Sequence, residues 1–166
     1  MEKAEIIKKI ELLKENFKVS PLKNYKNRIK ALKKLKKNIV EMQDEICESL
    51  KLDLNKSKEE AYMSEIGLVL SEINYMVKHL RKFAKPKKVY TPISQFPSKS
   101  YRIPSPYGVV LIISPWNYPF MLSIEPMVDA ISAGNSIVLK PSKTSGNVQK
   151  VIEKLIKKTF SEKEVL

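Results

Sequence analysis

Apolar side chains in the first 85 residues recur every three or four positions, the repeat that lines one face of a helix. Ser57 followed by Glu60 has the spacing of a capping box, which favours a helix start at that point. The pattern predicts three helices: residues 3–17, a long helix from Ser20-Pro21 to about Leu50, and a third from Ser57 after a break at residues 53–56.

Proline separates this helical part from the rest of the chain. Of ten prolines, only Pro21 precedes residue 86, and the other nine fall between Pro86 and Pro141. Because proline breaks helix interiors, residues 86–141 cannot form one helix. Short β-prone runs at 89–91 and 100–103 predict an extended hairpin, too thin to bury itself, that packs on something else such as another subunit.

From Tyr107 the pattern alternates strands with helices. The continuous apolar run at 108–113 is typical of a strand covered on both faces. A helix over 119–133 ends at Gly134, a second strand follows at 137–139, and Ser145 is placed to begin an amphipathic helix. This β-α-β-α order is the opening of a doubly wound parallel sheet.

The predicted fold class is therefore α/β, with N-terminal helices and a β-arm leading into an incomplete doubly wound parallel sheet. We expect a helical segment over 1–85, the arm over 86–106, and the first part of a dinucleotide-binding domain over 107–166. Two strands cannot complete such a sheet, so most of their apolar surface stays open. That open surface predicts poor solubility or partial order for the chain alone.

The formal net charge of +13 raises the possibility of a nucleic-acid partner. Residues 1–88 hold 22 of the basic and 13 of the acidic residues, and lysines 33, 34, 36 and 37 interleave with an apolar stripe. This arrangement predicts the solvated face of a helix. A nucleic-acid or anionic-membrane surface is the alternative, but no aromatic platform accompanies the lysines, so we expect no nucleic-acid partner.

Composition narrows the class further. Apolar residues make up 43% of the chain, which excludes wholesale disorder. No window reaches about 18 apolar residues, so no transmembrane span is expected. The N-terminus lacks the apolar core of a signal peptide, and the default compartment is the cytosol. A single cysteine excludes an internal disulfide framework and a cysteine-cluster metal site, and no metal is expected.

Two proline-braced loops follow the predicted strands, and in open α/β sheets ligands bind at that edge. The first loop, residues 114–119, presents the amide of Asn117 beside the indole of Trp116. An amide donor can stabilise a developing oxyanion. The second loop presents Lys140 and Lys143, and a lysine there can bond ribose hydroxyls or phosphate. By pattern alone, ordinary turn residues are the alternative.

The motifs in these loops carry a family resemblance. Residues 106–120 (PYGVVLIISPWNYPF), with Ala133-Gly-Asn135 and Val138-Leu-Lys-Pro-Ser142, resemble the aldehyde dehydrogenase superfamily. The Trp-Asn-Tyr-Pro form is similar to its class 3, fatty-aldehyde-like branch. The resemblance extends from about residue 5 to residue 160.

The resemblance implies a mechanism and roles. In that family a cysteine thiolate attacks an aldehyde to form a thiohemiacetal, hydride passes to NAD or NADP, and a glutamate-activated water hydrolyses the thioester. Asn117 matches the asparagine whose amide helps hold the oxyanion. The positions that match the cofactor site are Ile113, Ser114, Pro115 and Trp116, which line the cofactor, and Lys140 and Ser142, which lie around the adenosine ribose.

The sequence departs from the family in two ways. The catalytic cysteine and the general-base glutamate lie beyond residue 166 in the family, so we expect the N-terminal portion of an enzyme, inactive alone, whether truncated, split or a fragment. Cys47 reads as a small core hydrophobe and His79 as an ordinary helical residue. At Lys143 the family often has a glutamate. A lysine attracts a 2′-phosphate, which favours NADP, and a plain surface lysine is the alternative.

A different class of function stays open beside the enzyme. The chain can instead be a non-catalytic protein that docks on an intact subunit. The partners expected for the enzyme are a small aldehyde substrate, a second copy through the arm, or a complementing C-terminal fragment.

Overall fold

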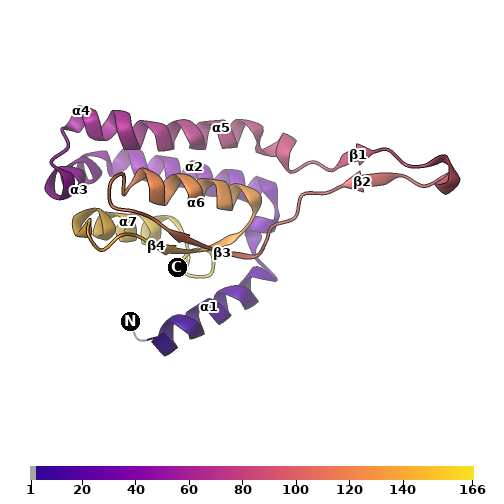
Figure 1. The fold of residues 1–166 in the computed structure, drawn as a ribbon, viewed down its shortest axis with the longest axis horizontal. Coiled ribbons are helices and arrows are strands. Elements are labelled where there is room, and N and C mark those ends of the chain that lie inside the picture. Colours follow the sequence, from indigo (N-terminus) through magenta and orange to yellow (C-terminus); the bar gives the residue numbers. More distant parts are fainter. Residues whose placement is uncertain (1–2) are drawn as a thin grey trace.

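The computed structural model describes residues 3–166, in which helices pack on a small parallel sheet and a hairpin projects from one end (Figure 1). The N-terminal part contains α1 (Lys3–Phe17), the 3-10 turn η1 (Pro21–Lys23), α2 (Tyr25–Glu41), α3 (Gln43–Leu54), α4 (Lys58–Ala61), the π-helical turn η2 (Tyr62–Ile66) and α5 (Gly67–Phe83). The remainder contains β1 (Lys87–Val89), the 3-10 turn η3 (Ile93–Gln95), β2 (Ser100–Arg102), β3 (Val109–Ile113), α6 (Met121–Ala133), β4 (Ser136–Lys140) and α7 (Gly146–Thr159).

The prediction of one long helix from Ser20-Pro21 to about Leu50 is wrong. The Ser20 hydroxyl accepts a hydrogen bond from the Leu22 N–H at 3.2 Å, but this cap begins only η1. The backbone then leaves the α conformation at Met42 (φ −100°, ψ 10°), between α2 and α3. Met42 is itself buried, so the apolar spacing continues through the break and cannot reveal it.

The predicted helix start at Ser57 is confirmed, since its hydroxyl accepts a hydrogen bond from the Glu60 N–H at 3.1 Å. The helix is not regular, because the π-helical turn η2 interrupts it before α5. A Cβ at Gly67 would lie 3.0 Å from the carbonyl oxygen of Tyr62, so the close approach within this turn favours a residue without a Cβ.

The sheet pairs β3 and β4 in parallel, from Val109 opposite Ser136 to Ile113 opposite Lys140. On the far side of β4, Val165 bridges Ile137 in parallel, so the chain begins a third strand position there. Helix α6 packs on one face of the sheet, and α1 contacts the other (Figure 1).

Strand β3 is not covered on both faces, although its apolar run is typical of such a strand. Leu111 and Ile113 are 59% and 64% exposed. The strand instead agrees with the expectation that two strands leave apolar surface open, because α1 reaches only part of that face.

Helix α2 lies at the centre of the helical layer and contacts α5, α6 and α7. Leu32, Leu35 and Ile39 on its inner face are fully buried. Its lysines point outward, as predicted, but two of them also join neighbouring helices. Lys34 donates to the carbonyl oxygen of Thr159 at 2.6 Å, and Lys36 donates to Asn74 at 2.8 Å.

The predicted arm is present as an antiparallel hairpin, in which Lys87 pairs with Arg102 and Val89 with Ser100. It extends away from the body of the protein (Figure 1). Among the residues that the structure describes, no helix is both long and apolar enough to cross a bilayer.

The guanidinium group of Arg28 binds the C-terminal end of α6. It donates to the carbonyl oxygens of Ser132 at 3.1 Å, Lys23 at 3.0 Å and Leu22. Burial lowers the pKa of Arg28 from its ordinary value. Gly134, which ends the helix as predicted, has a φ of 93°, and a Cβ there would lie 2.7 Å from Arg28 Cζ.

We therefore predict that Gly134→Ala lowers the free energy of unfolding by roughly 1–3 kcal/mol, because it combines a left-handed backbone with a clash against Arg28. Urea denaturation followed by circular dichroism measures the change. Gly146→Ala is the matched control, since nothing lies within 4 Å of its added Cβ and it begins a helix. Equal losses in the two variants would contradict the prediction.

Candidate functional site

The loops after β3 and β4 lie side by side at one edge of the sheet. The Ser114 N–H donates to the carbonyl oxygen of Lys140 at 3.2 Å, which continues the strand pairing into the first loop. This edge is at the opposite end of the protein from the arm (Figure 1). The structure thus places at the same edge of the sheet the two loop motifs that the sequence singled out.

The first loop is braced from within. The hydroxyls of Ser114 and Ser123 are 2.6 Å apart, and Ser123 also donates to the carbonyl oxygen of Pro119 at 2.6 Å. Between these anchors Asn117 is exposed and Trp116 is 55% exposed. A rigid backbone therefore presents an amide and an indole to an approaching ligand, and Ile113 and Pro115 are exposed beside them.

A buried carboxylate holds the start of α6, and sequence reasoning missed it. Glu65, in η2, is fully buried. One carboxylate oxygen accepts from the N–H groups of Phe120 at 2.8 Å and Met121 at 3.1 Å. The other accepts from the ammonium group of Lys56 at 2.6 Å. These bonds satisfy donors that every helix start leaves free.

A signal for Glu65 existed in the sequence. It occupies a row of four-residue spacing with Ala61, Val69 and Ile73, all of which are fully buried. An acidic residue inside an apolar row indicates a buried charge that needs partners.

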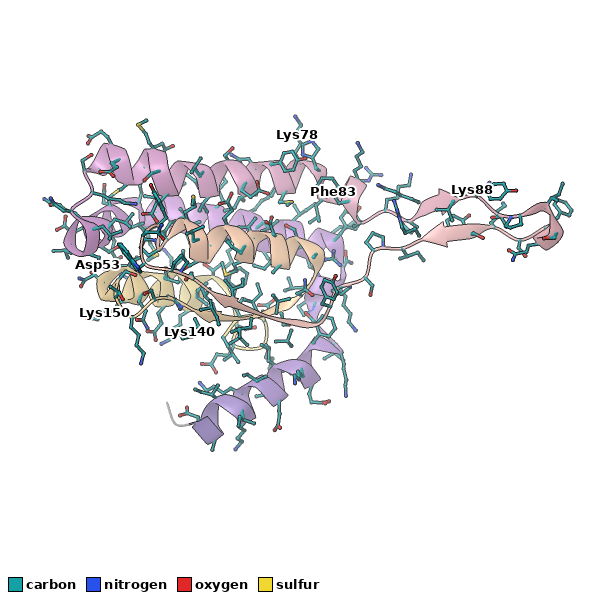
Figure 2. The ribbon with its side chains drawn as sticks, in the orientation of Figure 1. Asp53, Lys78, Phe83, Lys88, Lys140 and Lys150 are labelled. Carbon is teal, nitrogen blue, oxygen red and sulfur yellow. The ribbon has the colours of Figure 1, made fainter. Side chains whose placement is uncertain are left out.

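The second loop presents cations and a hydroxyl at the same edge. Lys140 and Lys143 are exposed, and Ser142 is half-buried. The Ser142 hydroxyl accepts a hydrogen bond from the Thr144 N–H at 3.2 Å. Figure 2 shows Lys140 at the end of β4, on the side of the sheet away from α6. Ammonium and hydroxyl groups of this kind suit ribose hydroxyls and phosphate oxygens, so the donor set fits the ribose and phosphate groups of a dinucleotide.

Helix α7 begins directly after Ser145, as predicted, but the Ser145 hydroxyl does not cap it. Among the described residues the buried Ser145 hydroxyl has no hydrogen-bond partner. Its ψ of 69° departs from the extended conformation of a capping residue. Instead the carboxylate of Asp53 accepts from Val148 N at 2.8 Å and from the N–H and side-chain amide of Asn147 at 3.3 and 2.7 Å (Figure 2).

Cys47 and His79 lie outside the two loops. Cys47 is 6% exposed on α3, and burial raises the pKa of its thiol, as suits the predicted core residue. His79 lies on α5, where its Nδ1 is 2.8 Å from the carbonyl oxygen of Tyr75.

Comparison with known proteins identifies relatives of this arrangement. The model of the aldehyde dehydrogenase family matches residues 1–166. A 4,4'-diaponeurosporen-aldehyde dehydrogenase of Staphylococcus aureus is 46% identical over 144 residues, which cover 87% of this chain and 31% of that protein. Aldehyde dehydrogenase family 3 member I1 of Arabidopsis thaliana, a chloroplastic protein, is 39% identical over 88% of this chain and 26% of its own length.

The fold agrees with a solved structure of one such enzyme. The substrate-bound state of Staphylococcus aureus AldH superposes with a TM-score of 0.93 at 44% identity, covering 96% of this chain and 35% of that one. This match confirms the predicted fold class. The chain spans about a third or less of the length of the relatives described here. The domain limits at residues 85/86 and 106/107 stay predictions.

We predict that Asp53→Ala lowers the free energy of unfolding by about 1 kcal/mol, because it removes the acceptor at the start of α7. Ser145→Ala is the control, and it should cost much less because no hydrogen bond of that hydroxyl is lost. Guanidinium denaturation of both variants measures the difference. A larger loss in Ser145→Ala than in Asp53→Ala would contradict the assignment of the cap.

Proposed function

Because the chain belongs to the aldehyde dehydrogenase family, we propose that it contributes the oxyanion-binding amide and part of the adenosine pocket of an NAD(P)-dependent aldehyde dehydrogenase. One observation carries the proposal: the exposed Asn117 and the exposed lysines of the second loop share one edge of the parallel sheet. The reaction is the oxidation of an aldehyde to a carboxylic acid.

Asn117 is the proposed catalytic residue in this chain. Its side-chain amide donates a hydrogen bond to the aldehyde oxygen as that oxygen gains negative charge. A donor held in place before the reaction costs no reorganisation when the charge develops. The bracing of the loop by Ser114 and Ser123 supports this role, since it holds the backbone from which the amide projects.

The proposed cofactor residues are Ile113, Ser114, Pro115 and Trp116 in the first loop, and Lys140, Ser142 and Lys143 in the second. Lys140 and Ser142 bond the adenosine ribose, and Lys143 attracts a 2′-phosphate. When bound, NAD or NADP accepts the hydride that leaves the substrate carbon.

These 166 residues do not supply the nucleophile in this proposal. Cys47 is buried on α3, and burial raises the pKa of its thiol, which disfavours the reactive thiolate. The attacking thiolate and the base that activates water therefore come from other residues of the enzyme. The 166 residues alone are expected to be inactive toward aldehydes.

The arm is the proposed contact with a second copy of the protein. Large apolar side chains near its tip are almost fully exposed, namely Tyr90 at 85%, Ile93 at 90% and Phe96 at 84%. Exposed groups of this size favour burial against a partner.

The function is tested by Asn117→Ala in the complete enzyme that contains these residues. We expect a loss of about 10²–10³ in kcat, because one oxyanion donor is removed. Formation of the reduced nicotinamide, followed by its absorbance with an aldehyde substrate, measures the rate. Asn74→Ala, at an exposed site on α5 bonded to Lys36, is the matched control. A change of less than a few-fold in Asn117→Ala would overturn the role.

Lys143→Glu tests the choice of cofactor. A carboxylate at this position repels a 2′-phosphate and can accept bonds from ribose hydroxyls, so the preference should shift toward NAD. We expect the ratio of kcat/KM for NAD to that for NADP to rise by about tenfold, corresponding to about 1.4 kcal/mol. Lys150→Glu, an exposed lysine on α7 with the same change in charge, is the control. A strong NAD preference that Lys143→Glu leaves unaltered would contradict the hypothesis.

A further inference from the structure

We propose that the buried pair of Lys56 and Glu65 is a positioning device that sets the direction in which Asn117 projects. The inference rests on the oxyanion role proposed above for Asn117. It assigns a task to two charged residues that lie in the helical layer, more than 50 positions before Asn117 in the sequence.

Glu65 binds the backbone at the end of the first loop. Its two oxygens accept three charge-assisted hydrogen bonds, two of them from the backbone of Phe120 and Met121. No part of the residue is exposed to solvent. The point at which the loop becomes α6 is therefore tied to η2.

Lys56 contacts the middle of the first loop. Its ammonium nitrogen lies 3.4 Å from the carbonyl oxygen of Asn117 and 4.1 Å from the ring centroid of Tyr118. The first contact is long for a hydrogen bond, and the second is a close cation–π contact. Lys56 is 7% exposed, so water does not compete strongly for either contact.

The pair acts on the backbone of Asn117 through Lys56, and it makes no hydrogen bond with the side-chain amide of Asn117. The carbonyl oxygen of Asn117 faces the buried ammonium group, while the residue as a whole is exposed. Fixing the peptide on one side restricts the directions open to the side chain on the other. An error of about 1 Å in placing a catalytic group can cost about 100-fold in rate.

Local backbone geometry brings the pair together. Asn55 adopts a left-handed conformation (φ 54°) after α3, which turns the chain so that Lys56 enters the interior. The π-helical turn places Glu65 opposite the start of α6. π-Turns inside helices occur frequently at functional sites.

The experiment combines a spectroscopic and a kinetic measurement. Trp116 is the only tryptophan of these 166 residues and directly precedes Asn117. Its emission and its quenching by acrylamide report the state of the loop, and a Trp116→Phe counterpart serves as the blank. The test variant is Lys56→Met/Glu65→Gln, which removes both charges and leaves no unpaired charge buried. Far-UV circular dichroism checks that the variant is folded.

The control is Lys58→Met/Asp44→Asn. That ion pair has the same nitrogen–oxygen distance of 2.6 Å, but it is exposed and does not contact the loop. We expect the control to leave Trp116 and kcat unchanged. The test variant should increase acrylamide quenching of Trp116 and lower kcat about 100-fold, with a much smaller change in KM.

A double-mutant cycle separates positioning from a general structural effect. In an Asn117→Ala background the test variant should cause no further loss of kcat, because the group that it positions is absent. Additive losses would overturn the inference, as would unchanged Trp116 quenching in the folded test variant. If Asn117→Ala alone leaves kcat unchanged while the pair still moves Trp116, the proposed function fails and the coupling of the pair to the loop stands.

Discussion

The free N–H groups at the starts of α6 and α7 impose the constraint on which this structure depends. Both helices begin directly after a loop at the carboxyl edge of the sheet, in surroundings that are partly or fully buried. Glu65 satisfies the first and Asp53 the second, in each case with a carboxylate from the helical layer. A negative group at a helix start also complements the helix dipole.

This constraint links the two halves of the chain. The helical layer does more than cover the sheet, because it fixes where each loop ends and each helix begins. Arg28 does the corresponding work at the other end of α6, where its guanidinium bonds the carbonyl oxygen of Ser132. Helix α6 is thus held at both ends by charges of the sign that its dipole favours. The loop that carries Asn117 leads directly into α6, so its end is held in place as well.

Two surfaces carry apolar side chains that the rest of the chain does not cover. Leu111 and Ile113 leave one face of β3 open, and the arm exposes aromatic side chains at its tip. The arm is at one end of the protein, and the loops that follow β3 and β4 are at the other (Figure 1).

Much of the architecture was predictable from the sequence, because helix spacing, apolar runs and the distribution of proline are local properties. They predicted α1, the cap at Ser57, the strands, the left-handed end at Gly134 and the arm, and the loop motifs selected Asn117, Lys140 and Lys143. The break at Met42 and the cap of α7 by Asp53 were not predictable. Met42 keeps the apolar spacing while its backbone turns, and Asp53 lies 95 positions before the Val148 N–H that it binds. The pairing of Lys56 with Glu65, and the contacts of this pair with the loop, likewise form only once the helices have packed. A buried charge is paired with groups that are close in the folded structure, and these can be far away in the sequence.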